Sequence, residues 1–379
     1  MRKEVISLTQ KLIRINSQNP PGNEKRIAHF IKDYLKDLGL SCELYEFKKD
    51  RTNVLVRLTS KKKKKTILFT PHLDTVPVTG KWRYPPLGGV IVDGRIYGRG
   101  ATDCKSNVAV SLAVIKKFKM KQISLDNLDV IFVFSSDEET GSKWGIKPLV
   151  KRLKGIDYGV VLDSDEFDII VAQKGLLHLR IEVFGKEAHG AYPERGINAI
   201  ENSICALNYL LKKKILSSKP HKLLKGNTIN IGKFEGGNKV NIVAGYAYFD
   251  LDIRFIPPLT EEKIIGYLKK IFDKYLKKYK IKILSYQLPI EIDTNNFLIK
   301  ILKKTLRKHN LAIHFRPSFG ATVINFLKDR GIETFGFGFG SRGCAHTENE
   351  YVRIDYLVKG VEILKDYIIT LDKYLEKHN

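Results

Sequence analysis

The stretch VIFVFSSDEE, residues 130–139, joins a continuous apolar run to three consecutive acids. A short apolar run of this kind is typical of a strand buried on both faces, as in a parallel sheet. Carboxylates are costly to place beside such a core unless something compensates their charge, and a metal ion does so. Ligands of open parallel sheets bind at the carboxyl ends of the strands. The stretch therefore predicts an α/β fold with a metal site after this strand, although an acidic helix N-terminus would have the same pattern.

Five residues of metal-binding type lie at or near the ends of expected strands. They are His72, Asp103, Glu139, Asp163 and His346. Each one alone fits a structural role; Asp103, for example, precedes a helix and suits an N-cap. Together they supply two imidazoles and three carboxylates, which suit two divalent metal ions, with Zn²⁺ favoured and Co²⁺ or Mn²⁺ as alternatives. Because two metal ions about 4 Å apart can turn a shared water into a nucleophile, the set predicts a dinuclear metallohydrolase.

Four more residues have the chemistry that such a site needs. Asp74 stands two residues after His72, where it can accept the second imidazole proton. Adjacent side chains point in different directions, so one of Glu138 and Glu139 can bind a metal ion while the other faces a water molecule. His189 and Arg254 lie further along the chain, where a capping histidine and a surface arginine are the alternative interpretations.

The order of expected elements predicts how the chain is divided. Helices and strands alternate over residues 1–175, which indicates a mostly parallel sheet flanked by helices. Over residues 176–287 the order is strand, helix, strand, strand, helix, strand, as in a ferredoxin-like unit. Residues 288–379 return to the first pattern. We therefore expect a catalytic, metal-binding domain made of residues 1–175 and 288–379, with residues 176–287 inserted into it.

Composition limits the class of protein. No apolar run reaches the roughly 18 residues of a membrane span, and no secretory signal is visible. The four cysteines are scattered, which indicates reduced thiols in a cytoplasm. The net charge of +25 raises the alternative of a nucleic-acid-binding protein. Most lysines, however, fall on the polar faces of amphipathic helices, as in residues 268–278, so we expect neither a nucleic-acid nor a membrane partner.

Six motifs, taken as an ordered set, resemble the M20 family of metallopeptidases and amidohydrolases. They are PHLDTVPV (71–78), GRGATDCK (98–105), SSDEETGS (135–142), GKEAHGAYPERGINAI (185–200), the strand at 241–254 and AHTENEYV (345–352). The family includes acetylornithine deacetylase, succinyl-diaminopimelate desuccinylase, aminoacylase and carboxypeptidase G2. The resemblance covers nearly the whole chain. It implies a zinc-exopeptidase-like fold, and an inserted domain that closes over the substrate as a lid and forms a homodimer.

The resemblance also implies how the metal ions are shared. His72 and Asp163 would complete one metal site, Glu139 and His346 would complete the other, and Asp103 would bridge them. A cis peptide bond would follow the bridging aspartate.

The remaining roles follow from the same resemblance. Asp74 would orient the first histidine, and Glu138 would be the general base. His189 would stabilise the oxyanion, from the partner subunit of the dimer. Asn241 and Arg254 would hold polar groups of the substrate. The substrate loop would include Gly320 and Thr322.

The chain departs from the family pattern where the substrate binds. The loop 320–325 lacks the usual aspartate and arginine, and Ser164-Asp165 replaces a usual Pro-Thr. No metal ligand is lost. We therefore expect a hydrolase of the amide bond of an N-acyl amino acid. The alternatives are a dipeptidase, carboxypeptidase or aminopeptidase of this family acting on short peptides, a metal-bound amino-acid-binding protein without turnover, and a basic RNA-associated scaffold.

Overall fold

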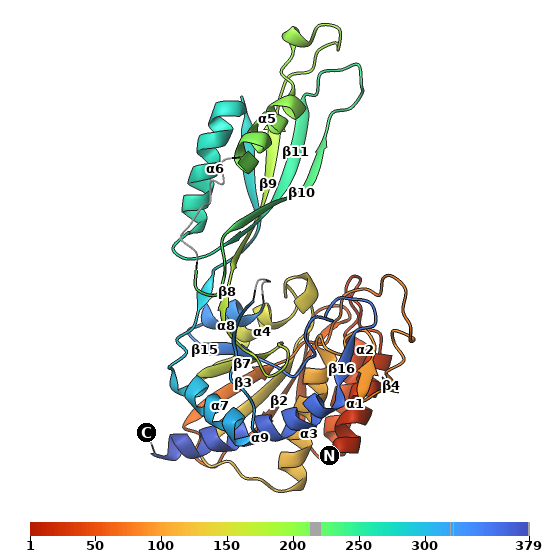
Figure 1. The fold of residues 1–379 in the computed structure, drawn as a ribbon, viewed down its shortest axis with the longest axis vertical. Coiled ribbons are helices and arrows are strands. Elements are labelled where there is room, and N and C mark those ends of the chain that lie inside the picture. The colour runs from red at the N-terminus through yellow and green to blue at the C-terminus, as the bar shows by residue number, and fades with distance from the viewer. Residues whose placement is uncertain (213–220, 319, 321, 378–379) are drawn as a thin grey trace. The chain divides into compact units, whose positions relative to one another are not determined.

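The computed structural model describes residues 1–212, 221–318, 320 and 322–377 (Figure 1). The chain forms two compact units. Unit 1 consists of Met1–Val171, Ile292–Arg316 and Thr322–Asn379, and unit 2 consists of Ala172–Glu291 and Pro317–Ala321. The roles of catalytic domain and lid stay predictions for these parts of the chain. None of the described helices is long and apolar enough to cross a membrane.

The central sheet carries, in its described part, nine strands in the order β1-β2-β6-β3-β7-β15-β8-β13, with β14 paired to β8. Their bounds are β1 Cys42–Lys48, β2 Arg51–Leu58, β3 Lys65–Thr70, β6 Leu128–Phe134, β7 Tyr158–Leu162, β8 Ile169–Gln173, β13 Ile290–Glu291, β14 Phe315–Ser318 and β15 Glu333–Phe337. The four middle strands, β6, β3, β7 and β15, are mutually parallel, and antiparallel strands flank them. The expected α/β fold with a mostly parallel sheet is confirmed.

Helices pack against this sheet. Their bounds are α1 Arg2–Arg14, α2 Lys25–Asp37, α3 Lys105–Met120, α4 Ile146–Arg152, α7 Phe297–Lys308, α8 Ile324–Lys328 and α9 Ile354–Lys377. Helix α3 is buried over most of its length because α1 and α9 both pack against it. Because its first residue, Lys105, follows directly on residues 103 and 104, this buried helix fixes the loop that carries Asp103.

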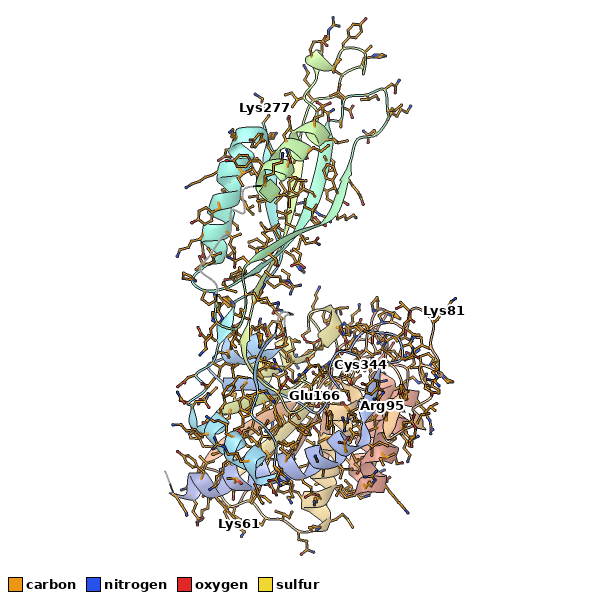
Figure 2. All side chains as sticks on the ribbon, viewed as in Figure 1. Lys61, Lys81, Arg95, Glu166, Lys277 and Cys344 are labelled. Atoms are coloured by element: carbon orange, nitrogen blue, oxygen red, sulfur yellow. The ribbon has the colours of Figure 1, made fainter. Side chains whose placement is uncertain are left out.

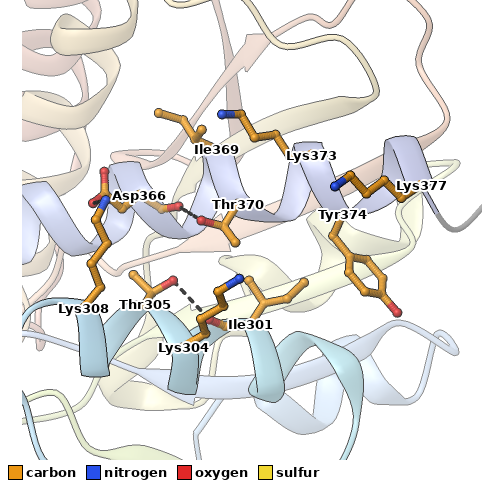
Figure 3. Close-up of a pocket in the computed structure, with 10 residues that line it drawn as sticks. All are labelled: Ile301, Lys304, Thr305, Lys308, Asp366, Ile369, Thr370, Lys373, Tyr374 and Lys377. Carbon is orange, nitrogen blue, oxygen red and sulfur yellow. Dashed lines mark hydrogen bonds and ion pairs between the residues drawn. The ribbon is translucent and has the colours of Figure 1, made fainter.

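The positive charge is spread over the surface of the units. Lys61, Lys81 and Lys277 are exposed and project from the ribbon (Figure 2). The groove between α7 and α9 is lined by four lysines together with apolar residues such as Ile301 and Ile369 (Figure 3). These lysines are Lys304, Lys308, Lys373 and Lys377. They stand on the polar faces of the two helices, as the amphipathic pattern predicts.

Unit 1 also contains a small sheet of order β16-β5-β4. Its hairpin, β4 Val90–Val92 and β5 Arg95–Tyr97, turns at Asp93-Gly94, a pair of residues typical of tight hairpin turns. Its third strand, β16 Tyr351–Arg353, was not predicted, and it pairs with β5. His346 therefore lies between strand β15 and this further strand. The pairing also brings the chain around residue 350 next to the chain around residue 100.

Unit 2 has the strand and helix order expected for a ferredoxin-like fold. Its antiparallel sheet has the order β10-β11-β9-β12. The bounds are β9 Gly175–Phe184, α5 Ala199–Lys212, β10 Thr228–Gly236, β11 Tyr246–Phe255, α6 Glu261–Tyr275 and β12 Tyr279–Gln287. Alternate residues of β9 and β11 are buried, and they pack against α5 and α6. Helix α6 begins at an N-cap, where the Thr260 hydroxyl accepts the backbone N–H of Lys263.

Candidate metal centre

The carboxyl ends of three neighbouring parallel strands carry the first part of the candidate site. His72 follows β3, Asp163 follows β7, and Glu138 and Glu139 follow β6 in the short 3-10 turn η1, Glu138–Thr140. In register, Phe69 of β3 lies between Phe132 of β6 and Val160 of β7, so the three strands end at the same edge. The side chains that follow them therefore converge, as the positions of the apolar runs predict.

Asp103 lies between the two predicted histidines, with one carboxylate oxygen towards each. Its Oδ1 is 2.8 Å from His72 Nε2, and its Oδ2 is 3.0 Å from His346 Nε2. His346 Nε2 is also 3.2 Å from Glu139. His72 Nε2 is 3.8 Å from Asp163 Oδ1. All five predicted ligands thus come together, and the carboxylate in the middle has the arrangement that a bridging ligand needs.

The donor set fits divalent cations. Ligand atoms of His72, Asp103 and Glu139 all lie within 4.8 Å of one another. Within the described part of the chain, the carboxylates of Asp103, Glu139 and Asp163 form ion pairs with the two histidines. None of the three forms an ion pair with a lysine or an arginine there. Hydrogen bonds to Asp103 and Glu139 raise the pKa of His346 to about 10. Imidazoles and clustered carboxylates are hard-to-borderline ligands suited to zinc, cobalt or manganese.

Glu138 precedes the predicted ligand Glu139 in the chain. It takes part in neither of the two shortest contacts of the cluster, which join Asp103 to His72 and to His346. Burial, which outweighs the charge of His72, acts together with Asp163 and other nearby carboxylates to raise the pKa of Glu138 well above its usual value. A carboxyl group with a raised pKa can both accept and return a proton near neutral pH.

Asp74 is buried, but its contacts differ from those the sequence suggested. The shortest contact of His72 Nδ1 is the backbone carbonyl of Asp74, at 3.0 Å, while the carboxylate Oδ1 lies 3.5 Å away. The Asp74 carboxylate instead accepts the backbone N–H groups of Glu138, at 3.0 Å, and Glu139, at 3.1 Å. It therefore holds the loop after β6 as well as facing the histidine.

Glu350 is a site residue that sequence reasoning missed. Its buried carboxylate accepts the N–H groups of Gly100, Thr102 and Asp103 and bonds Arg99 Nη1 at 2.8 Å. It thus ties the Asp103 loop to the chain that carries His346. The signal in the sequence was its place in AHTENEYV, four residues after a predicted ligand.

Cys104 is a second neighbour that was not predicted. Its sulfur lies with His72 and Asp163 in a group of potential ligand atoms that are within 4.8 Å of one another. The thiol donates to the Leu162 carbonyl at 3.0 Å, and burial raises its pKa to about 11. The peptide bond between Asp103 and Cys104 is cis, as the resemblance implies.

The remaining predicted residues lie apart in the chain. His189 and Asn241 belong to unit 2 and are exposed, and the bond from Gly190 N to Asn241 O, 2.8 Å, holds their two loops together. Arg254, also in unit 2, makes a two-pronged ion pair with Asp252 at 2.7 and 3.1 Å. Gly320 lies in unit 2, and Thr322 begins the last part of unit 1.

Comparison with known proteins places the chain among hydrolases. The sequence profile of "Peptidase family M20/M25/M40" matches residues 68–370. An uncharacterized metallohydrolase of Methanocaldococcus jannaschii is 31% identical, over 97% of this chain and 99% of its own length. Succinyl-diaminopimelate desuccinylase of Buchnera aphidicola is 29% identical, over 95% of this chain and 96% of its own length.

Solved structures share the fold. The M20 family metallo-carboxypeptidase Sso-CP2 of Sulfolobus solfataricus matches with a TM-score of 0.80 and 21% identity, over 98% of this chain and 99% of its own. A tripeptidase of Staphylococcus aureus matches with a TM-score of 0.79 and 22% identity, with the same coverage. The likeness therefore extends over both units.

Proposed function

The chain belongs to peptidase family M20/M25/M40 and is a metal-dependent hydrolase, and from this premise we propose that it cleaves the amide bond of an N-acyl amino acid. The observation that carries the proposal is the Asp103 carboxylate, which faces His72 on one side and His346 on the other. With Asp163 and Glu139 these residues would hold two divalent metal ions, for which we favour zinc. Such a pair supplies a metal-activated water and a polarised carbonyl group.

Glu138 is the proposed general base. It takes a proton from the attacking water, and it gives a proton to the nitrogen as the C–N bond of the amide breaks. The products are a carboxylate and a free amino acid. Burial and the neighbouring carboxylates raise the pKa of Glu138, and a raised pKa makes the carboxylate a stronger proton acceptor than an ordinary glutamate. Asp74 positions Glu138 through the backbone N–H that it accepts.

The residues of unit 2 are proposed to bind the substrate and to complete the site. His189 stabilises the oxyanion of the tetrahedral state, from the partner subunit of a homodimer. Asn241, Arg254, Gly320 and Thr322 contact the substrate, with Arg254 directed to a carboxylate. Because Arg254 is paired with Asp252, we expect the substrate carboxylate to compete with that aspartate. We place the reaction in the cytoplasm, consistent with four free cysteines.

Substitution of Glu138 tests the proposed mechanism. We expect Glu138→Gln to lower kcat by about a thousandfold or more, because it removes the proton acceptor while keeping the size of the side chain. Two metal ions per chain should remain, as measured by elemental analysis. Activity near that of the unsubstituted protein would exclude Glu138 as the base.

A substrate panel separates the proposed activity from its alternatives. Zinc-loaded protein is incubated with N-acetyl and N-succinyl amino acids and with dipeptides and tripeptides. A deacylase releases acetate or succinate, whereas a peptidase releases free amino acids from the peptides. A binding protein would retain amino acids without forming either product, even with both metal ions bound.

A further inference from the structure

A cluster of buried polar side chains lies behind the loop that carries Glu138. Its members are Asn19, Glu24, Arg51, Asp74 and Asp137, and each is at most 4% exposed. Buried charges are retained only when other groups compensate them. The proposed function uses Asp74 alone, so the other four need a separate explanation.

Arg51 is the centre of this cluster. Its Nη2 donates to Asp137 Oδ1 at 2.6 Å, and its Nη1 donates to Asn19 Oδ1 at 3.1 Å and to the Pro21 carbonyl at 3.2 Å. Its Nε lies 2.9 Å from Glu24 Oε2, as an ion pair outside hydrogen-bond geometry. The planar guanidinium thus reaches these groups from three separate nitrogens in a fixed fork, whereas a lysine would have to reach them all from one ammonium nitrogen.

The cluster holds the backbone of three consecutive residues. Glu24 Oε1 accepts the N–H of Asp137 at 3.0 Å, and Asp74 accepts those of Glu138 and Glu139. Asn19 connects Asp74 to Arg51, because its Nδ2 donates to Asp74 Oδ2 at 2.8 Å and its Oδ1 accepts from Arg51 Nη1. Every amide from 137 to 139 is therefore bound to a buried carboxylate.

Asp137 has an unusual backbone conformation that these bonds explain. Its φ of +64° lies in the left-handed region, which residues other than glycine rarely adopt. Three hydrogen bonds hold Asp137 in this conformation. Its N–H donates to Glu24, and its carboxylate accepts from Arg51 and from the Trp144 N–H, the last at 2.8 Å. This turn sets the direction in which the next side chain, Glu138, leaves the backbone.

We propose that Arg51, together with Asn19 and Glu24, is a positioning residue that sets the place of Glu138 at the metal centre. The inference rests on the proposed role of Glu138 as base. All three residues precede residue 68, where the match to the family profile begins, so that match does not assign them. They act through Asp137 and Asp74, and among the described residues their hydrogen bonds reach no side chain of a proposed metal ligand.

The test compares kcat and KM for Arg51→Lys and Asn19→Ala at saturating zinc, with two bound metal ions verified by elemental analysis. We expect kcat to fall about 10- to 100-fold for Arg51→Lys and about tenfold for Asn19→Ala, with KM within about twofold, because a small misplacement of a catalytic group costs rate rather than binding. Arg57→Lys is the matched control. Arg57 is on the same strand, β2, but is exposed and paired with Glu43, so this variant should keep the full kcat.

A double substitution separates positioning from a general loss of structure. In the Glu138→Asp background, the added loss from Arg51→Lys should be smaller than in the unsubstituted protein, because both changes displace the same carboxylate. Equal losses in both backgrounds, or a folded Arg51→Lys protein with full kcat, would overturn the inference. If Arg51→Lys does not fold, Asn19→Ala decides by the same criteria. If Glu138→Gln is itself fully active, the role of Glu138 as base is wrong. If Glu138→Gln is inactive but Arg51→Lys is fully active, only the positioning role of Arg51 is wrong.

Discussion

At the scale of single residues, two buried carboxylates organise the loops of the candidate centre. Asp74 accepts two backbone N–H groups from the loop after β6, and Glu350 accepts three from the loop that carries Asp103. Neither was assigned this task from the sequence, because a sequence motif shows which residue types occur together but not which backbone groups they bond. Residue type and place in the sequence were enough to predict candidate metal ligands, but they did not predict the side chains that hold the loops.

Substitution of Glu350 should weaken metal binding without touching a proposed ligand. In Glu350→Gln the amide keeps one acceptor oxygen but loses the charge that pairs with Arg99, so the Asp103 loop is held less firmly. We expect the affinity for zinc to fall about 10- to 100-fold, the range seen when residues that orient metal ligands are changed. Competition with a chelator measures it. The exposed neighbour Glu348 provides the control, since Glu348→Gln should bind zinc normally. Unchanged affinity in a folded Glu350→Gln protein would contradict the role given to Glu350.

At the scale of elements, the parts that the sequence predicts well are those with a local signal. The strands before His72 and Asp163 are continuous apolar runs, and the β4–β5 hairpin has its Asp-Gly turn. Strands β8, β13 and β16 were not foreseen. Two of them have only two or three residues, and each pairs with a strand distant in sequence, so their formation depends on contacts that no local pattern reports. The place of His346 near Asp103 depends on one of these pairings.

One side chain of α9 should be important for the stability of the central sheet. The Asp372 carboxylate accepts the N–H groups of Asp126, Asn127 and Leu128, at 2.7 to 3.2 Å, where the chain enters β6. Asp372→Ala leaves these donors without a partner in a largely buried place, so we expect the free energy of unfolding to fall by about 2–4 kcal/mol. Urea unfolding followed by circular dichroism measures the change. Asp355→Ala, on the same helix but paired with Arg353 at the surface, should change stability by less than about 1 kcal/mol. Similar losses of unfolding free energy for both variants would show that the three hydrogen bonds of Asp372 do not contribute more to stability than a surface ion pair.

At the scale of the whole molecule, the proposed homodimer can be tested by mixing two inactive variants. If His189 acts in the site of the partner subunit, a chain with Glu138→Gln and a chain with His189→Ala are each nearly inactive by themselves but complement one another. In a mixed dimer, the chain with intact Glu138 receives an intact His189 from its partner, so one of its two sites is complete.

A mixed dimer has one complete site of its two, so its turnover should recover to about one half of that of the unsubstituted dimer. The two variants are co-expressed with different affinity tags, and the doubly tagged fraction is assayed with both metal ions bound. Metal content should be normal throughout, because neither substitution removes a proposed ligand. The control is a chain that carries both substitutions, mixed with inactive Glu138→Gln, which cannot form a complete site in any pairing. A mixed dimer that stays as inactive as its parents would place the action of His189 within its own chain, and a loss of zinc from His189→Ala would make this residue a ligand instead.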